Sequence, residues 1–184
     1  TLLGSYPKLK ISHEFEGKVV CDWGFGDGRN IILLNNCGLK ICGFEITQQI
    51  CDDVTDRMQR FGIETNLRVG RSKEVPFDNE IFDYVVASSS IYYIDKDSSF
   101  DDNLRELERV TKKGGYVIMT LAHPMTFMLK NSIKLKEGYY QVTDDPYKLR
   151  NGDVFRAFST EEEIFKTFSD GFEDICIGMQ DENY

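Results

Sequence analysis

The stretch from Val19 to Asn30 constrains the fold more than any other part of this sequence. A short apolar run ends at an acid, Asp22, and glycines at positions 24, 26 and 28 precede a helix-like segment. A continuous apolar run is typical of a buried parallel strand, and glycine lets the backbone of a turn come close to a ligand. The following helix offers free backbone N–H groups and the positive end of its dipole to an anionic group. This pattern predicts a strand, a cofactor-binding turn and a helix.

Along the rest of the chain, apolar runs alternate with helix-like segments. This alternation predicts an α/β fold with a Rossmann-like, doubly wound and mostly parallel sheet flanked by helices. The expected strands are 18–23, 40–45, 66–69, 82–88, 115–121 and 173–178, and the expected helices are 30–36, 48–61, 100–111 and 160–169. A capping box, Ser159-Thr160 followed by Glu162-Glu163, marks the start of the last helix. Because nothing resembles a linker, we expect residues 1–184 to form a single domain.

Composition narrows the classes of function. The 184 residues carry a net charge of −9 without any long basic run, whereas a nucleic-acid-binding protein usually presents a basic face. We therefore expect the protein to act on a small molecule, or on another protein, rather than on DNA or RNA. No apolar run is long enough for a transmembrane helix, and the five cysteines, which show no C-x-x-C pair, read as reduced thiols. These features favour a cytoplasmic protein without a membrane partner or a metal, and they leave the oligomeric state open.

The spacing of the glycines distinguishes two kinds of cofactor turn. The dinucleotide fingerprint G-x-G-x-x-G would require glycine at position 29, where the chain has arginine. The segment Asp22-Trp23-Gly24-Phe25-Gly26-Asp27-Gly28 instead closely resembles motif I of the class I S-adenosylmethionine-dependent methyltransferases. Further elements of that family follow in order at Cys42 to Thr47, Gly70 to Phe77, Phe82 to Ser88 and Arg109 to Val117. The resemblance covers residues 17–121 and points to the type 11-like small-molecule branch.

The resemblance implies S-adenosyl-L-methionine as the cofactor and S-adenosyl-L-homocysteine as the product. Backbone N–H groups of the glycine turn can receive the methionyl portion, and the carboxylate of Asp22 suits its ammonium group. Glu45 ends a strand 23 residues after Asp22, so its two oxygens can accept from vicinal ribose hydroxyls, although a strand-end acid can also be merely solvated. The residues predicted to bind the cofactor are Asp22, Gly24, Phe25, Gly26, Gly28, Asn30, Glu45, Ile46, Arg71, Ser72 and Ser88.

Two features depart from the family pattern. Relatives commonly have an aspartate that accepts from the adenine amino group at the position of Arg71, and an arginine cannot accept a hydrogen bond. Either Ser72 or a backbone carbonyl takes over that contact, or adenine recognition is looser. Arg71 itself can stack on the ring or be simply solvated. The family sheet also finishes with a seventh, antiparallel strand, and the sequence stops shortly after the sixth expected strand. The final antiparallel strand is therefore expected to be missing or replaced.

Methyl transfer requires an oriented acceptor in a suitable protonation state. His123, at the end of the fifth strand, is the candidate general base, unless it is a turn or packing residue before Pro124. Tyr92 is the second catalytic candidate. With Tyr93 it follows the fourth strand, although such an aromatic pair also suits a core. The D/N-P-P-Y/F/W motif is absent, which argues against adenine or glutamine as the methylated group.

Residues 124–158 do not fit the alternating pattern. A long irregular stretch in a compact domain is usually functional, and this one follows the carboxyl end of a strand, where open α/β sheets bind ligands. We therefore predict that residues 124–158 are a substrate-cap insertion. The residues predicted to contact the acceptor are Tyr93, Tyr139, Tyr140 and Arg150, with the arginine receiving a phosphate or carboxylate.

Taken together, these features predict an S-adenosylmethionine-dependent methyltransferase (EC 2.1.1.-) that acts on oxygen or nitrogen of a small-molecule acceptor. One alternative is an NAD-dependent Rossmann oxidoreductase, against which Arg29 counts. A second alternative is a non-catalytic S-adenosylmethionine-binding module, which the substitution at Arg71 leaves open. A protein acceptor also stays open, because an acidic surface can bind a basic protein.

Overall fold

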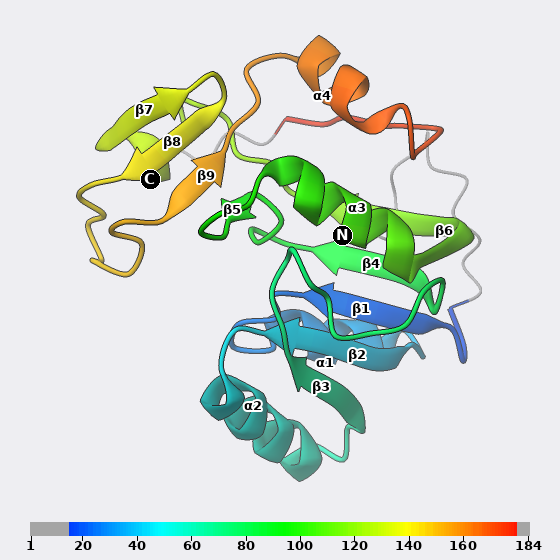
Figure 1. Cartoon of the computed structure of the whole chain (residues 1–184). Coiled ribbons are helices and arrows are strands. Elements are labelled where there is room, and N and C mark those ends of the chain that lie inside the picture. The colour runs from blue at the N-terminus through cyan, green and yellow to red at the C-terminus, as the bar shows by residue number, and fades with distance from the viewer. Residues whose placement is uncertain (1–14, 180–184) are drawn as a thin grey trace.

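The computed structural model describes residues 15–179, and a parallel sheet lies at its centre (Figure 1). Within these residues the sheet has five strands in the order β3-β2-β1-β4-β6, and every neighbouring pair is parallel. The strands are β1 (Val19–Trp23), β2 (Lys40–Glu45), β3 (Thr65–Val69), β4 (Phe82–Ala87) and β6 (Thr111–Met119). The Rossmann-like α/β fold is confirmed. Strand order reverses between β1 and β4, which is where such sheets bind ligands.

Helices cover both faces of this sheet, because alternate side chains of each strand point to opposite faces. The first face carries α1 (Arg29–Asn36) and α2 (Gln48–Arg60), whose apolar side chains share a core with Val20 of β1. The second face carries α3 (Phe100–Val110) and α4 (Glu161–Phe168), which share a core with Trp23. No helix within residues 15–179 is long and apolar enough to cross a membrane.

The helix starts follow capping chemistry, with one exception. Thr47 caps α2, and the hydroxyl of Thr160 accepts the backbone N–H of Glu163 at 3.2 Å at the start of α4. The carboxylate of Glu163 in turn accepts the N–H of Ser159 at 2.8 Å, so the expected helix start is found, but the reciprocal hydrogen bond reaches Ser159 and not the N-cap residue Thr160, as a capping box requires. The start of α1 has no side-chain cap, because Gly28 stands there with a φ of 74°. The backbone N–H of Arg29, the first residue of the helix, donates instead to Oδ1 of Asp27 at 3.4 Å, within the glycine turn.

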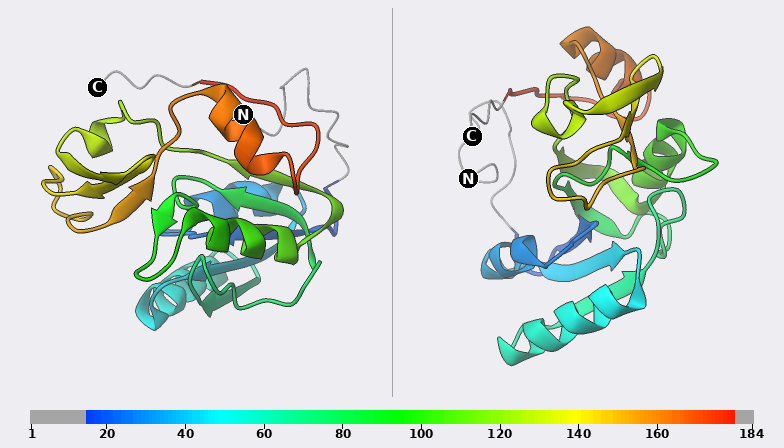
Figure 2. Two further views of the ribbon diagram at one scale, coloured as in Figure 1. Left: turned by 45° about the horizontal axis from the view of Figure 1, so that its top comes forward. Right: turned by 90° about the vertical axis from the view of Figure 1, so that its left-hand side faces the viewer.

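Residues 124–158 are not an irregular loop, and in this respect the sequence-based expectation is wrong. They contain a short 3-10 helix (Phe127–Leu129) and three strands, β7 (Ser132–Lys136), β8 (Tyr139–Val142) and β9 (Val154–Arg156). With β5 (Tyr93–Ile94), which lies far earlier in the chain, these strands form an antiparallel second sheet in the order β5-β9-β8-β7. Figure 2 shows this second sheet beside the carboxyl ends of the parallel strands.

The strand expected at residues 173–178 is not formed. Its neighbourhood is anchored instead by side chains, because Phe172 and Ile175 pack against the core that α3 and α4 share. Within residues 15–179, β6 is consequently the last strand on its side of the parallel sheet. The remaining residues, 180–184, where the family pattern would continue, lie outside the part of the chain that the structure describes.

Candidate functional site

Glycine is favoured at the three positions after β1 for different structural reasons. All have positive φ, 64° at Gly24, 55° at Gly26 and 74° at Gly28, which glycine adopts without strain. A Cβ atom at Gly24 would lie 2.8 Å from Cβ of Ser90, and one at Gly28 would lie 2.8 Å from Cγ1 of Val54. A Cβ atom at Gly26 would meet no atom of the described residues within 4 Å. Gly24 and Gly28 therefore permit close packing, whereas Gly26 faces open space that a ligand can use.

Asp22, at the end of β1, is fully buried beside this turn. Its Oδ1 accepts the side-chain amide of Asn30 at 3.3 Å, whereas its Oδ2 has no hydrogen-bond partner among residues 15–179. Burial raises the pKa of Asp22 from 3.8 to about 7; the Asn30 hydrogen bond opposes this, and the charges of Glu45 and Asp27 add to it. A buried carboxylate oxygen without a partner is suited to an ammonium group.

Glu45, at the end of β2, is joined to the glycine turn. Its Oε1 accepts the backbone N–H of Gly26 at 3.0 Å, and its Oε2 accepts the N–H of Ile46 at 2.8 Å. Each carboxylate oxygen can accept a second hydrogen bond, so both remain available to a pair of hydroxyl groups. The structure thus brings together four of the predicted cofactor residues, Asp22, Gly26, Asn30 and Glu45, through direct contacts or adjacent positions.

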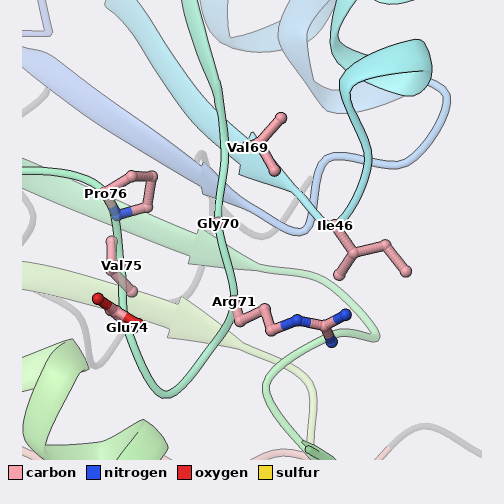
Figure 3. Close-up of a pocket in the computed structure, with 7 residues that line it drawn as sticks. All are labelled: Ile46, Val69, Gly70, Arg71, Glu74, Val75 and Pro76. Atoms are coloured by element: carbon pink, nitrogen blue, oxygen red, sulfur yellow. The ribbon is translucent and has the colours of Figure 1, made fainter.

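A pocket of about 320 Å³ opens next to Glu45 (Figure 3). Its lining residues come from the ends of β2 and β3 and from the loop after β3, namely Ile46, Val69, Gly70, Arg71, Glu74, Val75 and Pro76. Glycine is required at position 70 on steric grounds, because a Cβ atom there would lie 2.4 Å from Cδ of Pro76. Ile46 is 55% exposed, so an apolar side chain faces the pocket without a protein partner covering it. Such an open, partly apolar site suits the face of an aromatic ring.

The other predicted cofactor residues occupy three different environments. Ser72 accepts the indole N–H of Trp23 at 3.0 Å, which fixes its hydroxyl near the pocket. Phe25 is 3% exposed and belongs to the core under α1 and α2, so it packs in the protein interior. Ser88 is exposed directly after β4, at the carboxyl edge of the sheet.

A group of hydroxyls lies at this same edge, and Thr120 is the member that sequence reasoning did not single out. The hydroxyl of Ser90 donates to the carbonyl of Trp23 at 2.5 Å, which fixes the loop after β4 against the end of β1. Ser89 has a φ of 56°, a strained value for a non-glycine residue, and its N–H donates to Oγ1 of Thr120 at 2.6 Å. The run of three serines was the available signal, but Thr120 carries no motif that would single it out.

The two catalytic candidates lie in different environments, because His123 is at the surface and Tyr92 belongs to the core of the second sheet. His123 is exposed, and its Nδ1 accepts the N–H of Met125 at 3.2 Å, so a neutral imidazole in this position carries its proton on Nε2. Tyr92 is 2% exposed, stacks on Tyr93, and points its hydroxyl at Sδ of Met128, 3.9 Å away. Burial and the neighbouring Tyr93 raise the pKa of Tyr92 to about 12, so its hydroxyl stays protonated at neutral pH.

The structure brings Tyr93 and Arg150 into contact, and it packs Tyr140 in the same apolar cluster as Tyr93. Nε of Arg150 donates to the hydroxyl of Tyr93 at 3.2 Å, and its Nη1 donates to the buried carboxylate of Asp145 at 3.2 Å. The hydroxyl of Tyr139 instead accepts the N–H of Phe100 at 3.1 Å, at the start of α3. Tyr140 lies half-buried in β8, paired with Lys134 and Phe155. Among the described residues no group of three His, Cys, Asp or Glu side chains could hold a metal ion.

A glycine turn at the switch point of a parallel sheet, with an acid at the end of the next strand, defines a cofactor-binding α/β protein. Residues 21–119, more than half of the chain, match the methyltransferase domain family. The chain therefore belongs to the class I S-adenosylmethionine-dependent methyltransferases. Membership of this family decides against the NAD-dependent alternative. Comparison with curated proteins finds no match.

Solved structures share the fold at low sequence identity. An S-adenosylmethionine-dependent methyltransferase from Methanosarcina mazei is 18% identical with a TM-score of 0.66, and the match covers 88% of this chain and 84% of that one. A protein from Pyrococcus horikoshii is 19% identical with a TM-score of 0.63, over 82% of this chain and 71% of that one. Geranyl diphosphate C-methyltransferase from Streptomyces coelicolor, in complex with Mg²⁺, geranyl diphosphate and S-adenosyl-L-homocysteine, is 17% identical with a TM-score of 0.60, over 86% and 56%. This chain spans about half the length of some other solved relatives, 52% and 51% in two cases.

Proposed function

We propose that this chain binds S-adenosyl-L-methionine at the glycine turn and transfers its methyl group to oxygen or nitrogen of a small-molecule acceptor. The observation that carries the proposal is the buried Oδ2 of Asp22, which has no partner within residues 15–179 and lies at the switch point of the sheet. The site offers a matching group for each part of a ligand that has an ammonium group, a ribose diol and an adenine ring. Asp22 would take the ammonium, Glu45 the diol, and the pocket beside Ile46 the ring.

The chain's own contribution to the reaction is orientation. The donor supplies a methyl group already activated on a sulfonium, so the protein has to place the acceptor in line with it and exclude water. In this proposal residues 1–184 act as a single domain, residues 124–158 with β5 form the cap over the acceptor, and Tyr93 and Arg150 contact it from the cap side. His123 remains the proposed base. To accept a proton it must first release the N–H of Met125 or turn its ring.

The net charge of the chain supports a small molecule as the acceptor. With a net charge of −9 the chain is unsuited to a polyanionic substrate, which supports a small molecule over nucleic acid. The five cysteines are all free thiols, which supports a reducing compartment, and we place the protein in the cytoplasm on that ground.

Calorimetric titration of S-adenosyl-L-homocysteine tests the cofactor site. We expect Glu45→Ala to weaken binding by at least about tenfold, because in this proposal the carboxylate accepts hydrogen bonds from both ribose hydroxyls. Glu64→Ala, which removes an exposed acid between α2 and β3, is the matched control and should leave affinity unchanged. Equal affinity of the Glu45→Ala variant and the wild type would refute the assignment.

Turnover is tested separately, by incubating the protein with S-adenosyl-L-methionine and acceptors that carry hydroxyl, amine or nucleophilic carbon groups. Formation of S-adenosyl-L-homocysteine with a hydroxyl or amine acceptor supports the proposal. Binding of the cofactor without turnover on any acceptor would instead favour the non-catalytic binding module.

A further inference from the structure

Arg71 stands where relatives commonly have an aspartate, and the structure gives it a carboxylate partner from another loop. Its Nη1 donates to Oδ1 of Asp95 at 2.6 Å. The side chain of Asp95 is 18% exposed, so the anchor is largely fixed, whereas the side chain of Arg71 is 53% exposed. Two backbone hydrogen bonds between Arg71 and Glu74 hold the loop itself. The arginine is therefore positioned and not free in solvent.

The position of Arg71 relative to the pocket is the second observation. Arg71 lines the pocket, and Figure 3 shows its side chain extending toward the side on which Ile46 lies. A guanidinium group donates hydrogen bonds through its edge, which leaves its planar faces available for stacking on an aromatic ring or a base. The ion pair with Asp95 uses that edge. The exposed side chain of Ile46 offers an apolar surface to the same pocket.

We propose that Arg71, oriented by Asp95, stacks its guanidinium on the adenine ring of the cofactor, with Ile46 contacting the ring as well. Arg71 is then a binding residue that recognises the ring by its face, and Asp95 is a positioning residue that acts through Arg71. This mode of binding replaces acceptance of the adenine 6-amino hydrogen by a carboxylate. The inference rests on the proposed function, since it requires that the adenine ring occupies this pocket.

The chain provides a control for a merely structural role. Nζ of Lys73 donates to the carbonyl of Lys96 at 3.0 Å, so it joins the same two loops as the Arg71–Asp95 pair. Lys73 is not among the residues that line the pocket. If Arg71 acts only as a tether between loops, removing Lys73 should have a comparable effect. If Arg71 stacks on the ring, removing Lys73 should have little effect.

The experiment is calorimetric titration of wild type and variants with two ligands: S-adenosyl-L-homocysteine, and its analogue whose purine ring lacks the 6-amino group. We expect the wild type to bind both with affinities within about threefold, because a stacked ring needs no 6-amino donor. Arg71→Ala should weaken both by about tenfold, and Lys73→Ala should change neither. Asp95→Ala should weaken both by several-fold, whereas Asp95→Asn, which keeps an acceptor oxygen, should recover most of the affinity. Arg71→Asp, which restores an acceptor, should prefer the 6-amino ligand by about fivefold or more.

Three results would overturn the inference while leaving the proposed function intact. These are wild-type discrimination of more than about tenfold between the two ligands, unchanged affinity of Arg71→Ala for S-adenosyl-L-homocysteine, and equal losses in Arg71→Ala and Lys73→Ala. Failure of the wild type to bind either ligand would refute the proposed function itself. Thermal unfolding of each variant checks that the substitutions leave the fold unchanged.

Discussion

The buried carboxylate of Asp22 should make stability and ligand affinity depend on pH in opposite directions. In the ligand-free protein, burial raises its pKa from 3.8 to about 7 against the Asn30 hydrogen bond. A raised carboxyl pKa means that folding favours the protonated form. The stabilisation is full below about pH 4 and is lost as the pH rises through 7. At 1.36 kcal/mol per pH unit, the ionised form is destabilised by on the order of 4 kcal/mol at most.

A bound ammonium group reverses this preference, because it pairs with the ionised carboxylate. If S-adenosyl-L-homocysteine binds only the ionised form, affinity follows the ionised fraction. With a pKa of about 7, that fraction falls from about nine tenths at pH 8 to about one tenth at pH 6. The dissociation constant should therefore rise about tenfold between pH 8 and pH 6.

Asp22→Asn separates the two effects. At pH 8 the variant should unfold at higher denaturant concentration than the ligand-free wild type, because no buried charge remains, and its stability should vary less between pH 5 and 8. The same variant should bind S-adenosyl-L-homocysteine weakly, with an affinity that no longer falls toward pH 6. Glu64→Gln is the matched control, since this acid is exposed and lies outside the glycine turn. An Asp22→Asn variant that is less stable than the wild type at pH 8, with an unchanged pH profile, would refute the reasoning.

Two further substitutions test the acceptor side and the second sheet. His123→Ala should lower turnover while the affinity for S-adenosyl-L-homocysteine stays the same; wild-type turnover by steady-state assay would remove His123 from catalysis. Arg156→Ala should lower the free energy of unfolding by about 3 kcal/mol, because Arg156 is paired with Glu163 of α4 at 2.6 Å and lies 4.1 Å from the ring centre of Phe158. Chemical denaturation measures this loss, and a change below about 0.5 kcal/mol would show that the pair joining β9 to α4 contributes little.

The centre of the parallel sheet was readable from the sequence because β1 and β4 are mostly buried and largely apolar, whereas β3 and β6 at the two edges are only partly buried. The bounds of β2 were predicted to the residue, and those of β1 and β3 to within one residue. The second sheet was not predicted. Its strands are three to five residues long in β7 to β9, and they are completed by β5, which lies much earlier in the chain. Pairing between distant segments leaves no local period in the sequence.

The prediction of a strand at 173–178 was wrong for a related reason. An apolar pattern indicates that side chains are buried, but it does not indicate whether the backbone pairs with a neighbouring strand. Phe172 and Ile175 satisfy the pattern by packing against the core of α3 and α4. The same ambiguity applies to Tyr92, whose position after β4 suited either an active site or a core, and whose surroundings are those of a core.

The sequence by itself determined the cofactor class. The features that identify this class are local. They are the glycines at 24, 26 and 28, the acid at Glu45 and the ordered elements up to Val117, and adjacent residues specify the backbone geometry that they require. Only the tertiary structure decided how those residues are used. It left one oxygen of Asp22 without a partner among the described residues, and it joined Arg71 to Asp95 across 24 positions. Burial and long-range ion pairing depend on which segments the fold brings together, and spacing along the chain does not specify them.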